Sequence, residues 1–419
     1  MNQFTVSPDV VQTVVSVILI AVMLGVFLGA CAYSILLERK LSAWMQDRVG
    51  PNRVGPKGLI QPLADGLKFL LKEDYTPSTV DKALFMLAPG LIMLPAMIGF
   101  VIIPFAGHID LTAFVQWLGI AEAGATYSVV MMGATINIGL IYLVAVGGLG
   151  VYGVALGGWA SNNKWSFLGG LRASAQVVSY EIPMGLALLC VVLLMGSASP
   201  LSIVEQQVGG TWNLVHLPIV AVIFYTCLLA EANRAPFDLA ECESELVGGF
   251  HTEYSSMRFA MFFLAEYFHI ITGAGFFTLL FLGGWSLNPF TGLDLPIAGE
   301  WWLGLIQLAV VVTKMALLVA FAMVIRWSLP RFRFDQLMRL AWEGMIPTTL
   351  FMVLVVSFFI FLGWQEWMWG GSLGALVVIV LVNPLLPRQV NPNHKVPLAG
   401  SRYSPLRPDG ASEPLHEGS

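Results

Sequence analysis

Ionisable side chains inside apolar segments are the residues of this chain best suited to carry chemistry. Glu181 and Glu266 each lie seven residues into an apolar segment, which places them roughly 10 Å deep if the segments are transmembrane helices. Glu231 closes a third segment, and Lys314 lies near the middle of a fourth. Burying such groups in hydrocarbon is costly unless they pair or reach water. They therefore predict either a proton path or a structural Glu–Lys pair that fixes helix packing.

A second acidic group lies between residues 231 and 253. One arginine, Arg234, accompanies six carboxylates, which belong to Glu231, Asp238, Glu241, Glu243, Glu245 and Glu253. Glu241 and Glu245 are four residues apart and would share a helix face, where like charges repel. Crowded carboxylates share protons, and the interleaved apolar residues favour partial burial. Proton handling and an ordinary solvated acidic loop both fit this pattern.

The composition shows which elements must position these groups. Of 419 residues, 57% are hydrophobic and only 11% are charged, whereas a soluble domain carries about 25% charged residues. This balance excludes an intrinsically disordered chain and a nucleic-acid-binding protein. The four cysteines form no C-x-x-C pair and the histidines have no ligand spacing, so no metal site is expected. Nothing resembles a catalytic triad, and no catalytic residue is assigned.

The hydropathy pattern predicts an all-α, polytopic membrane helix bundle with about nine transmembrane helices. Twenty of the 21 Lys and Arg residues fall in loops on one side, and the exception is Lys314. This charge bias predicts a multi-pass protein of the cell inner membrane with its N-terminus outside and its C-terminus cytoplasmic. Residues 1–387 would form one membrane domain and 388–419 a disordered tail. The predicted spans are 11–37, 84–105, 126–157, 174–196, 215–231, 259–283, 302–326, 347–363 and 372–387.

Two loops on the predicted inside are more than simple connections. The acidic one covers 232–258, and the other covers 38–83. Within the latter, residues 58–73 carry a leucine-rich stripe opposite Asp65, Lys68 and Lys72, which predicts an amphipathic helix at the membrane surface. It would be either a passive anchor or the rim of an entrance for a lipid-soluble molecule.

A glycine motif in the third predicted span suggests close packing. Gly148-Leu-Gly150-Val-Tyr-Gly153 formally matches G-x-G-x-x-G but lies within a span and follows no strand, which argues against a nucleotide site. Close helix packing through Gly153 and Gly157 is the better interpretation.

Four stretches together resemble one known family. They are Leu37-Glu38-Arg39-Lys40 with Arg48-Val-Gly-Pro-Asn-Arg-Val-Gly-Pro and Gln61-Pro-Leu-Ala-Asp65-Gly-Leu-Lys68; Leu171-Arg172 through Tyr180-Glu181; Ala230-Glu231-Ala-Asn-Arg234-Ala-Pro-Phe-Asp238 through Glu253-Tyr254; and Ala265-Glu266-Tyr267 with Pro330-Arg331-Phe332-Arg333-Phe334-Asp335-Gln336-Leu337. Between about residues 11 and 387 the chain is similar to the H-subunit family of respiratory complex I, the proton-pumping NADH–quinone oxidoreductase.

The resemblance implies a membrane subunit that frames a quinone chamber, with quinone as the substrate. Arg39 and Asp65 would line the chamber, together with Arg234 and Asp238. The acidic funnel and proton path would comprise Glu231, Glu241, Glu243, Glu245, Glu181, Glu266 and Lys314. Arg172 and Arg326 match family positions at the inside ends of spans.

The resemblance also implies partners. Iron–sulfur clusters, FMN and NADH would belong to partner subunits, which include peripheral-arm quinone-module subunits and small membrane-arm subunits. Quinone and membrane lipid are also expected to bind, and nucleic acid is not. The alternatives are a homologous ion-translocating subunit of a hydrogenase or formate-oxidising complex, a non-redox secondary transporter, and a structural membrane anchor.

Overall fold

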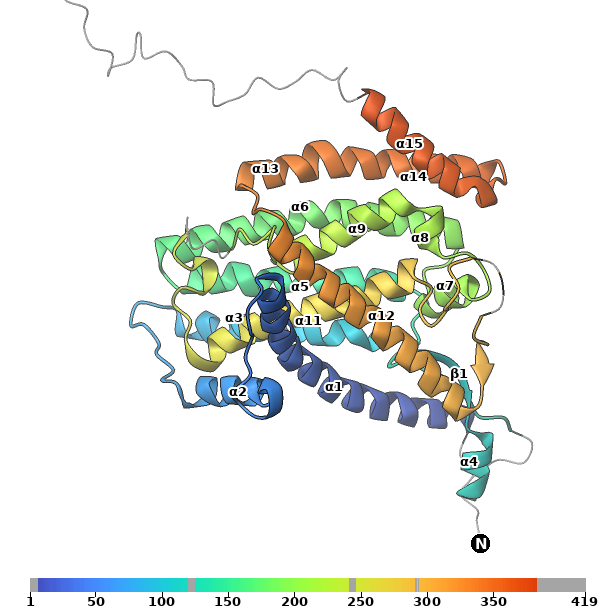
Figure 1. Ribbon diagram of the computed structural model, residues 1–419, viewed down its shortest axis with the longest axis horizontal. Helices are drawn as coiled ribbons and strands as arrows, with labels where there is room; N and C mark the ends of the chain where they lie inside the picture. Colours follow the sequence, from blue (N-terminus) through green and yellow to red (C-terminus); the bar gives the residue numbers. More distant parts are fainter. Residues whose placement is uncertain (1–6, 120–124, 241–245, 291, 293, 383–419) are drawn as a thin grey trace, which may run out of the picture. The chain divides into compact units, whose positions relative to one another are not determined.

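A computed structural model describes residues 7–119, 125–240, 246–290, 292 and 294–382. In the described chain, seven helices are long and apolar enough to cross a membrane, and two shorter apolar helices accompany them, in agreement with the predicted all-α bundle (Figure 1). The helices and single turns of helix are α1 (Pro8–Met45), η1 (Pro56–Gly58), α2 (Gln61–Leu71), α3 (Lys82–Ile98), η2 (Gly99–Ile102), α4 (Thr112–Trp117), α5 (Gly139–Ala160), α6 (Lys164–Met195), α7 (Pro200–Gln207), α8 (Asn213–His216), α9 (Pro218–Glu231), η3 (Gly249–His251), α11 (Ser256–Phe281), α12 (Trp301–Ser328), α13 (Phe334–Arg339), η4 (Leu340–Met345), α14 (Ile346–Phe361), η5 (Gln365–Trp367) and α15 (Met368–Val382).

The chain divides into two compact units, 1–376 and 377–419. In the second unit only residues 377–382, the end of α15, are described. The predicted disordered tail, 388–419, lies outside the described residues.

The predicted third span, 126–157, is wrong for residues 126–138, which are not part of the membrane helix. Residues Ser128–Met131 form the strand β2, and the membrane helix α5 begins only at Gly139. A short apolar run such as Val129-Val130 cannot be told from helix by hydropathy, because a buried strand and a buried helix are equally apolar. The helix is therefore 22 residues long and crosses a membrane without the extra length that the sequence suggested.

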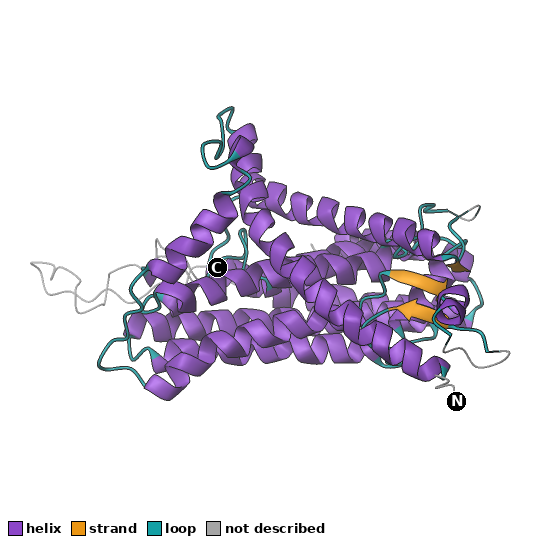
Figure 2. Cartoon of the chain, turned by 90° about the horizontal axis from the view of Figure 1, so that it is seen from below, coloured by secondary structure: helices purple, strands orange, loops and turns teal. Residues whose placement is uncertain are grey.

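A small sheet, which the sequence did not reveal, closes one end of the bundle (Figure 2). Its order is β2-β1-β3, with β1 (Ala106–Asp110) antiparallel to β2 and parallel to β3 (Ala298–Gly299). The Gln12 side chain of α1 accepts a hydrogen bond from the Val130 amide (2.9 Å), and Gln307 of α12 accepts one from the Gly107 amide (2.8 Å). The sheet thus ties the start of α1 to α12.

At the opposite end, hydrogen bonds join loops that are far apart in sequence. Asn162 donates to the Thr79 carbonyl (3.1 Å), and Asn163 donates to the Glu253 carboxylate (2.6 Å). The segments before α3, between α5 and α6, and before α11 therefore lie together. These are the segments to which the charge bias assigned a common side.

Close helix packing around α5 depends on glycine. A Cβ atom on Gly153 would lie 2.6 Å from the backbone nitrogen of Ile92 in α3, and one on Gly157 would lie 3.3 Å from the Phe262 ring in α11. Only a residue without a side chain permits the approach at Gly153, whereas at Gly157 an added Cβ would make a tight contact with the ring. The structure thus places close helix packing at both predicted glycines.

Candidate functional site: a lipid-side cavity and buried carboxylates

The helix α2 lies within the segment that was predicted to be amphipathic. Pro62 occupies the first turn, where its missing N–H costs nothing. Leu63, Leu67 and Leu70 are all exposed by half or more. A helix that presents leucines in this way is suited to a membrane interface.

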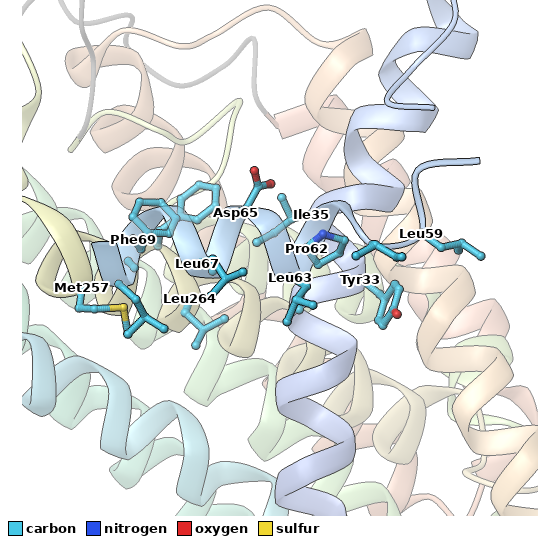
Figure 3. A pocket seen from close by; sticks show the side chains of 16 residues that line it. Tyr33, Ile35, Leu59, Pro62, Leu63, Asp65, Leu67, Phe69, Met257 and Leu264 are labelled. Atoms are coloured by element: carbon cyan, nitrogen blue, oxygen red, sulfur yellow. The ribbon is translucent and has the colours of Figure 1, made fainter. Parts of the chain in front are cut away.

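A cavity of about 600 Å³ lies between α1, α2 and α11. Its lining is almost wholly apolar and includes Tyr33 of α1, Leu63 and Leu67 of α2, and Met257 and Leu264 of α11 (Figure 3). A large apolar cavity with few polar groups is the usual form of a site for an apolar ligand. The three elements that enclose it are the first span, the surface helix and the sixth predicted span.

Asp65 is the acidic residue of this cavity. Figure 3 shows its carboxylate directed away from Leu63 and Leu67. It accepts hydrogen bonds from Arg39 of α1 (2.7 Å) and from the Gln61 amide (3.0 Å). The Arg39 side chain is 45% exposed, so this ion pair lies where α1 and α2 meet the solvent.

A buried group of charges lies behind the cavity wall. Arg234 Nε is 3.1 Å from Glu266 Oε2, and Arg234 Nη1 is 3.8 Å from Glu38 Oε2. Glu38 also pairs with Arg326 and accepts a 2.6 Å hydrogen bond from the Tyr267 hydroxyl. Among the described residues, the group holds two positive and two negative charges. Such compensation is what permits charged side chains to be buried.

Aromatic rings connect the cavity to this group. The Arg234 guanidinium lies 4.2 Å from the centroid of the Tyr267 ring and 5.2 Å from that of Phe263. Phe263 also lines the cavity. One side chain therefore faces both the apolar space and the buried arginine.

Sequence reasoning did not select Glu38 or Tyr267 as site residues. Glu38 was placed at the start of the loop 38–83, but α1 continues as a helix to Met45 and buries this carboxylate. The available signal was the apolar periodicity, which runs past Glu38 through Leu41 and Ala43. A glutamate inside a continuing helix should have been treated like Glu181 and Glu266.

Glu181 and Glu231 lie against consecutive glycines of α5. The added Cβ of Gly148 would lie 2.7 Å from Glu181 Oε1, and that of Gly147 would lie 2.7 Å from Glu231 Oε1. Both carboxylates therefore lie against α5 at adjacent residues. The structure thus brings together these two predicted residues from α6 and α9.

The loop after α9 is held by one amide side chain. Gln176 Nε2 in α6 donates to the carbonyls of Ala230 (2.9 Å) and Phe237 (2.8 Å) and to Asn233 Oδ1 (3.3 Å). In this loop Asp238 is buried and pairs with Arg331 (2.8 Å). The predicted funnel residues Glu241, Glu243 and Glu245 lie outside the described residues.

Two predicted arginines take different places. Arg326 joins the buried charge group through Glu38, whereas the Arg172 guanidinium lies 5.6 Å from the centroid of the Phe334 ring. Arg172 is therefore placed at the junction of α6 and α13.

Lys314 is placed apart from the buried carboxylates. Its ammonium donates to the carbonyls of Leu282 (2.6 Å), Gly284 (2.9 Å) and Ser286, and it lies 4.2 Å from the centroid of the Trp212 indole ring. These carbonyls follow the end of α11, sixteen residues or roughly 24 Å along the helix from Glu266. The structure does not bring Lys314 to Glu181 or Glu266.

The described residues contain no group of three His, Cys, Asp or Glu side chains that could hold a metal ion. The arrangement consists instead of an apolar cavity, a compensated ion group, and carboxylates inside a helix bundle. These features define a polytopic membrane protein with an apolar cavity and with ionisable groups within the membrane region.

Comparison with known proteins gives the family. Residues 17–357 match the sequence profile of the NADH dehydrogenase family, and the chain belongs to this family. It is 42% identical to an H subunit of NADH-quinone oxidoreductase from Cytophaga hutchinsonii over 340 residues, which are 81% of this chain and 95% of that protein. It is 46% identical to an H subunit of the same enzyme from Koribacter versatilis over 357 residues (83% and 97%). For an H subunit from Geobacter sulfurreducens the identity is 44% over 326 residues (78% and 89%).

Proposed function

We propose that this chain is a membrane subunit of a proton-translocating NADH–quinone oxidoreductase and that the cavity between α1, α2 and α11 admits quinone from the lipid. The observation that carries the proposal is the position of Phe263, which faces both the apolar cavity and Arg234. A ligand in the cavity would therefore lie next to a buried ion group. The names of the relatives, each a subunit of NADH-quinone oxidoreductase, support this interpretation.

The chemistry assigned to this chain is binding and charge response rather than electron transfer. Electrons would reach quinone from an iron–sulfur cluster of a partner subunit, and NADH and FMN would also belong to partners. Reduction of quinone to quinol takes up two electrons and two protons, so negative charge develops in the chamber until the protons arrive. In a medium of effective dielectric constant about 20, a unit charge about 10 Å away changes the energy of a carboxylate by about 1.7 kcal/mol. Such a change is enough to redistribute protons.

The carboxylates that would respond are Glu266, Glu231 and Glu181. Glu266 is bound to the same arginine that faces Phe263, while Glu231 and Glu181 lie together against α5. Glu241, Glu243 and Glu245 would supply protons from the inside, and Asp65, Arg39 and Asp238 would shape the chamber. A role for Lys314 in the path remains a prediction.

The same proposal places the N-terminus outside and the cytoplasmic loops at the end where α2 lies. The loops joined by Asn162 and Asn163 are those rich in Lys and Arg, which favours the cytoplasmic side. Peripheral-arm subunits that carry the cluster would dock at this end, and small membrane-arm subunits beside the bundle.

Glu181 offers the sharpest test of proton movement. No ion pair holds it among the described residues, so Glu181→Gln should leave the complex assembled while it lowers the number of protons pumped per NADH oxidised. Pumping would be followed with a pH-sensitive dye in inverted membrane vesicles. Full pumping by the assembled variant would refute the proposed path.

The quinone site is tested by filling the cavity. Leu67→Trp places a larger side chain in the lining and should raise the KM for a short-chain quinone, while the rate of NADH oxidation by a water-soluble artificial acceptor stays unchanged. Leu71→Trp is the matched control, because Leu71 lies on the same helix, is 85% exposed and does not line the cavity. Equal KM values for the two variants would argue against quinone in this cavity.

A further inference from the structure

His269 of α11 is an ionisable residue that the proposed path does not use. It lies three residues, about one helical turn, after Glu266, so the two side chains share a helix face. In the described part of the chain it makes no hydrogen bond or ion pair. A Cβ atom on Gly150 of α5 would lie 3.5 Å from His269 Nε2. The imidazole therefore faces the same helix as Glu181 and Glu231.

Two small cavities border His269. The first, of about 30 Å³, lies among α3, α5, α6, α9 and α11 and includes Thr272 in its lining. The second, of about 20 Å³, is lined by Glu266 and Asn233 among others. The residues common to both linings are Gly147, Glu231 and His269.

The size and lining of these cavities suit water. A cavity needs a volume of about 10–15 Å³ and two to four polar partners to hold one water molecule. The second cavity offers Glu231, His269, Glu266 and Asn233 as partners, and the first offers Glu231, His269 and Thr272. Glu266, His269 and Glu231 all line the second cavity, so the imidazole lies beside any water that connects the two carboxylates.

We propose that His269 is a proton relay between Glu266 and Glu231. This inference rests on the proposed function and adds a residue to its path. A protonated Glu266 gives its proton, through water, to one ring nitrogen of His269, and the other ring nitrogen gives a proton to the Glu231 carboxylate. Glu266 ends as carboxylate, Glu231 ends as carboxylic acid, and the imidazole is again neutral with its proton on the other nitrogen. Rotation of the ring, or transfer in reverse, restores the first tautomer.

Charged groups lie at both ends of this route. Arg234 pairs with Glu266 at 3.1 Å, and Glu181 and Glu231 lie against adjacent glycines of α5. Negative charge on quinone beside Phe263 would lie near Arg234 and weaken its interaction with the Glu266 carboxylate, so the redox state of the chamber can change where the proton resides along the route.

The test is chemical rescue of His269→Ala in the whole complex. A positioned acid–base group contributes typically 10²–10⁴-fold, but water in the cavities would retain part of the transfer, so we expect proton-coupled quinone reduction to fall roughly tenfold. Added imidazole should restore pumping, whereas pyrazole, which has nearly the same shape but is a far weaker base, should not. Thr272→Val, which alters the same cavity without removing an ionisable group, is the control and should show no imidazole effect.

The outcomes separate the alternatives. Normal pumping by His269→Ala, or equal rescue by imidazole and pyrazole, would overturn the relay and leave a packing role. If this variant does not assemble, His269→Asn decides, because its amide is polar but does not take up a proton: lost pumping supports the relay and normal pumping overturns it. If the His269 variants and Glu181→Gln all pump normally, the proposed function itself fails. If the His269 variants pump normally but Glu181→Gln does not, only the role of His269 is refuted.

Discussion

Loss of charge at two adjacent residues of α1, Glu38 and Arg39, should destabilise the protein to very different extents. Each forms an ion pair, but the Glu38 side chain is 10% exposed and the Arg39 side chain 45%. Glu38→Gln leaves Arg326 without its partner and weakens the hydrogen bond from Tyr267. Among the described residues, the buried group then holds two positive charges against one negative charge.

The magnitude follows from burial. Removing one partner of a buried ion pair costs about 3–5 kcal/mol. Glu38→Gln has this effect on Arg234, whose side chain is 7% exposed and which keeps Glu266 as its counter-ion. Removing one partner of a solvated pair costs about 0–1 kcal/mol, and Arg39→Gln leaves Asp65 with partial exposure to water and the hydrogen bond from Gln61. Glu38→Gln should therefore destabilise the protein by several times as much as Arg39→Gln, although the residues are neighbours.

The assay is the apparent Tm of the purified complex together with its yield on a native gel. Glu38→Gln should lower both, and Arg39→Gln should change neither. The double variant Glu38→Gln with Arg326→Gln restores charge balance in the group and should recover part of the loss, which a double-mutant cycle would show as coupling. Equal Tm values for the two single variants, or no recovery in the double variant, would refute the assignment of these charges to a buried, compensated group.

Three further predictions concern α3, α5 and α12. Gly148→Ala adds a Cβ 2.7 Å from Glu181 Oε1 and should reduce the protons pumped per NADH, whereas Gly25→Ala, which meets open space, should not. Lys314→Met removes three hydrogen bonds to carbonyls and should cost about 3 kcal/mol or more, visible as lower Tm and yield; normal stability with lost pumping would instead indicate a proton-path role. Asp81→Ala removes the side-chain cap of α3, which accepts from the amides of residues 83 and 84, and should lower stability by about 1 kcal/mol without changing turnover.

Charge distribution predicted much of this fold because charged side chains are costly to bury in hydrocarbon and because Lys and Arg concentrate in cytoplasmic loops. Scarcity of charge indicated the bundle, and Glu181 and Glu266 stood out because each is an exception to that scarcity. Hydropathy could not separate β2 from helix, since Val129 and Val130 are as apolar as a span. Hydropathy also could not identify Glu38 as buried. The charged sequence Glu38-Arg39-Lys40 is equally compatible with a surface loop and with the last turns of a membrane helix. Nor could spacing show that Lys314 lies far from Glu266, which depends on where α11 ends.

The hydrogen bonds of Gln176 have a mechanical consequence. The two N–H groups of its side-chain amide reach three acceptors and fasten the loop that carries Arg234 and Asp238 to α6, which contributes about 1 kcal/mol for each N–H group. Glu181 is five residues further along α6, or roughly 7.5 Å. The loop therefore does not move independently of α6. A displacement of Arg234 must either strain the hydrogen bonds of Gln176 or shift α6 together with the loop. A change at the quinone chamber would then reach Glu181 as movement of one rigid piece, in addition to any electrostatic effect.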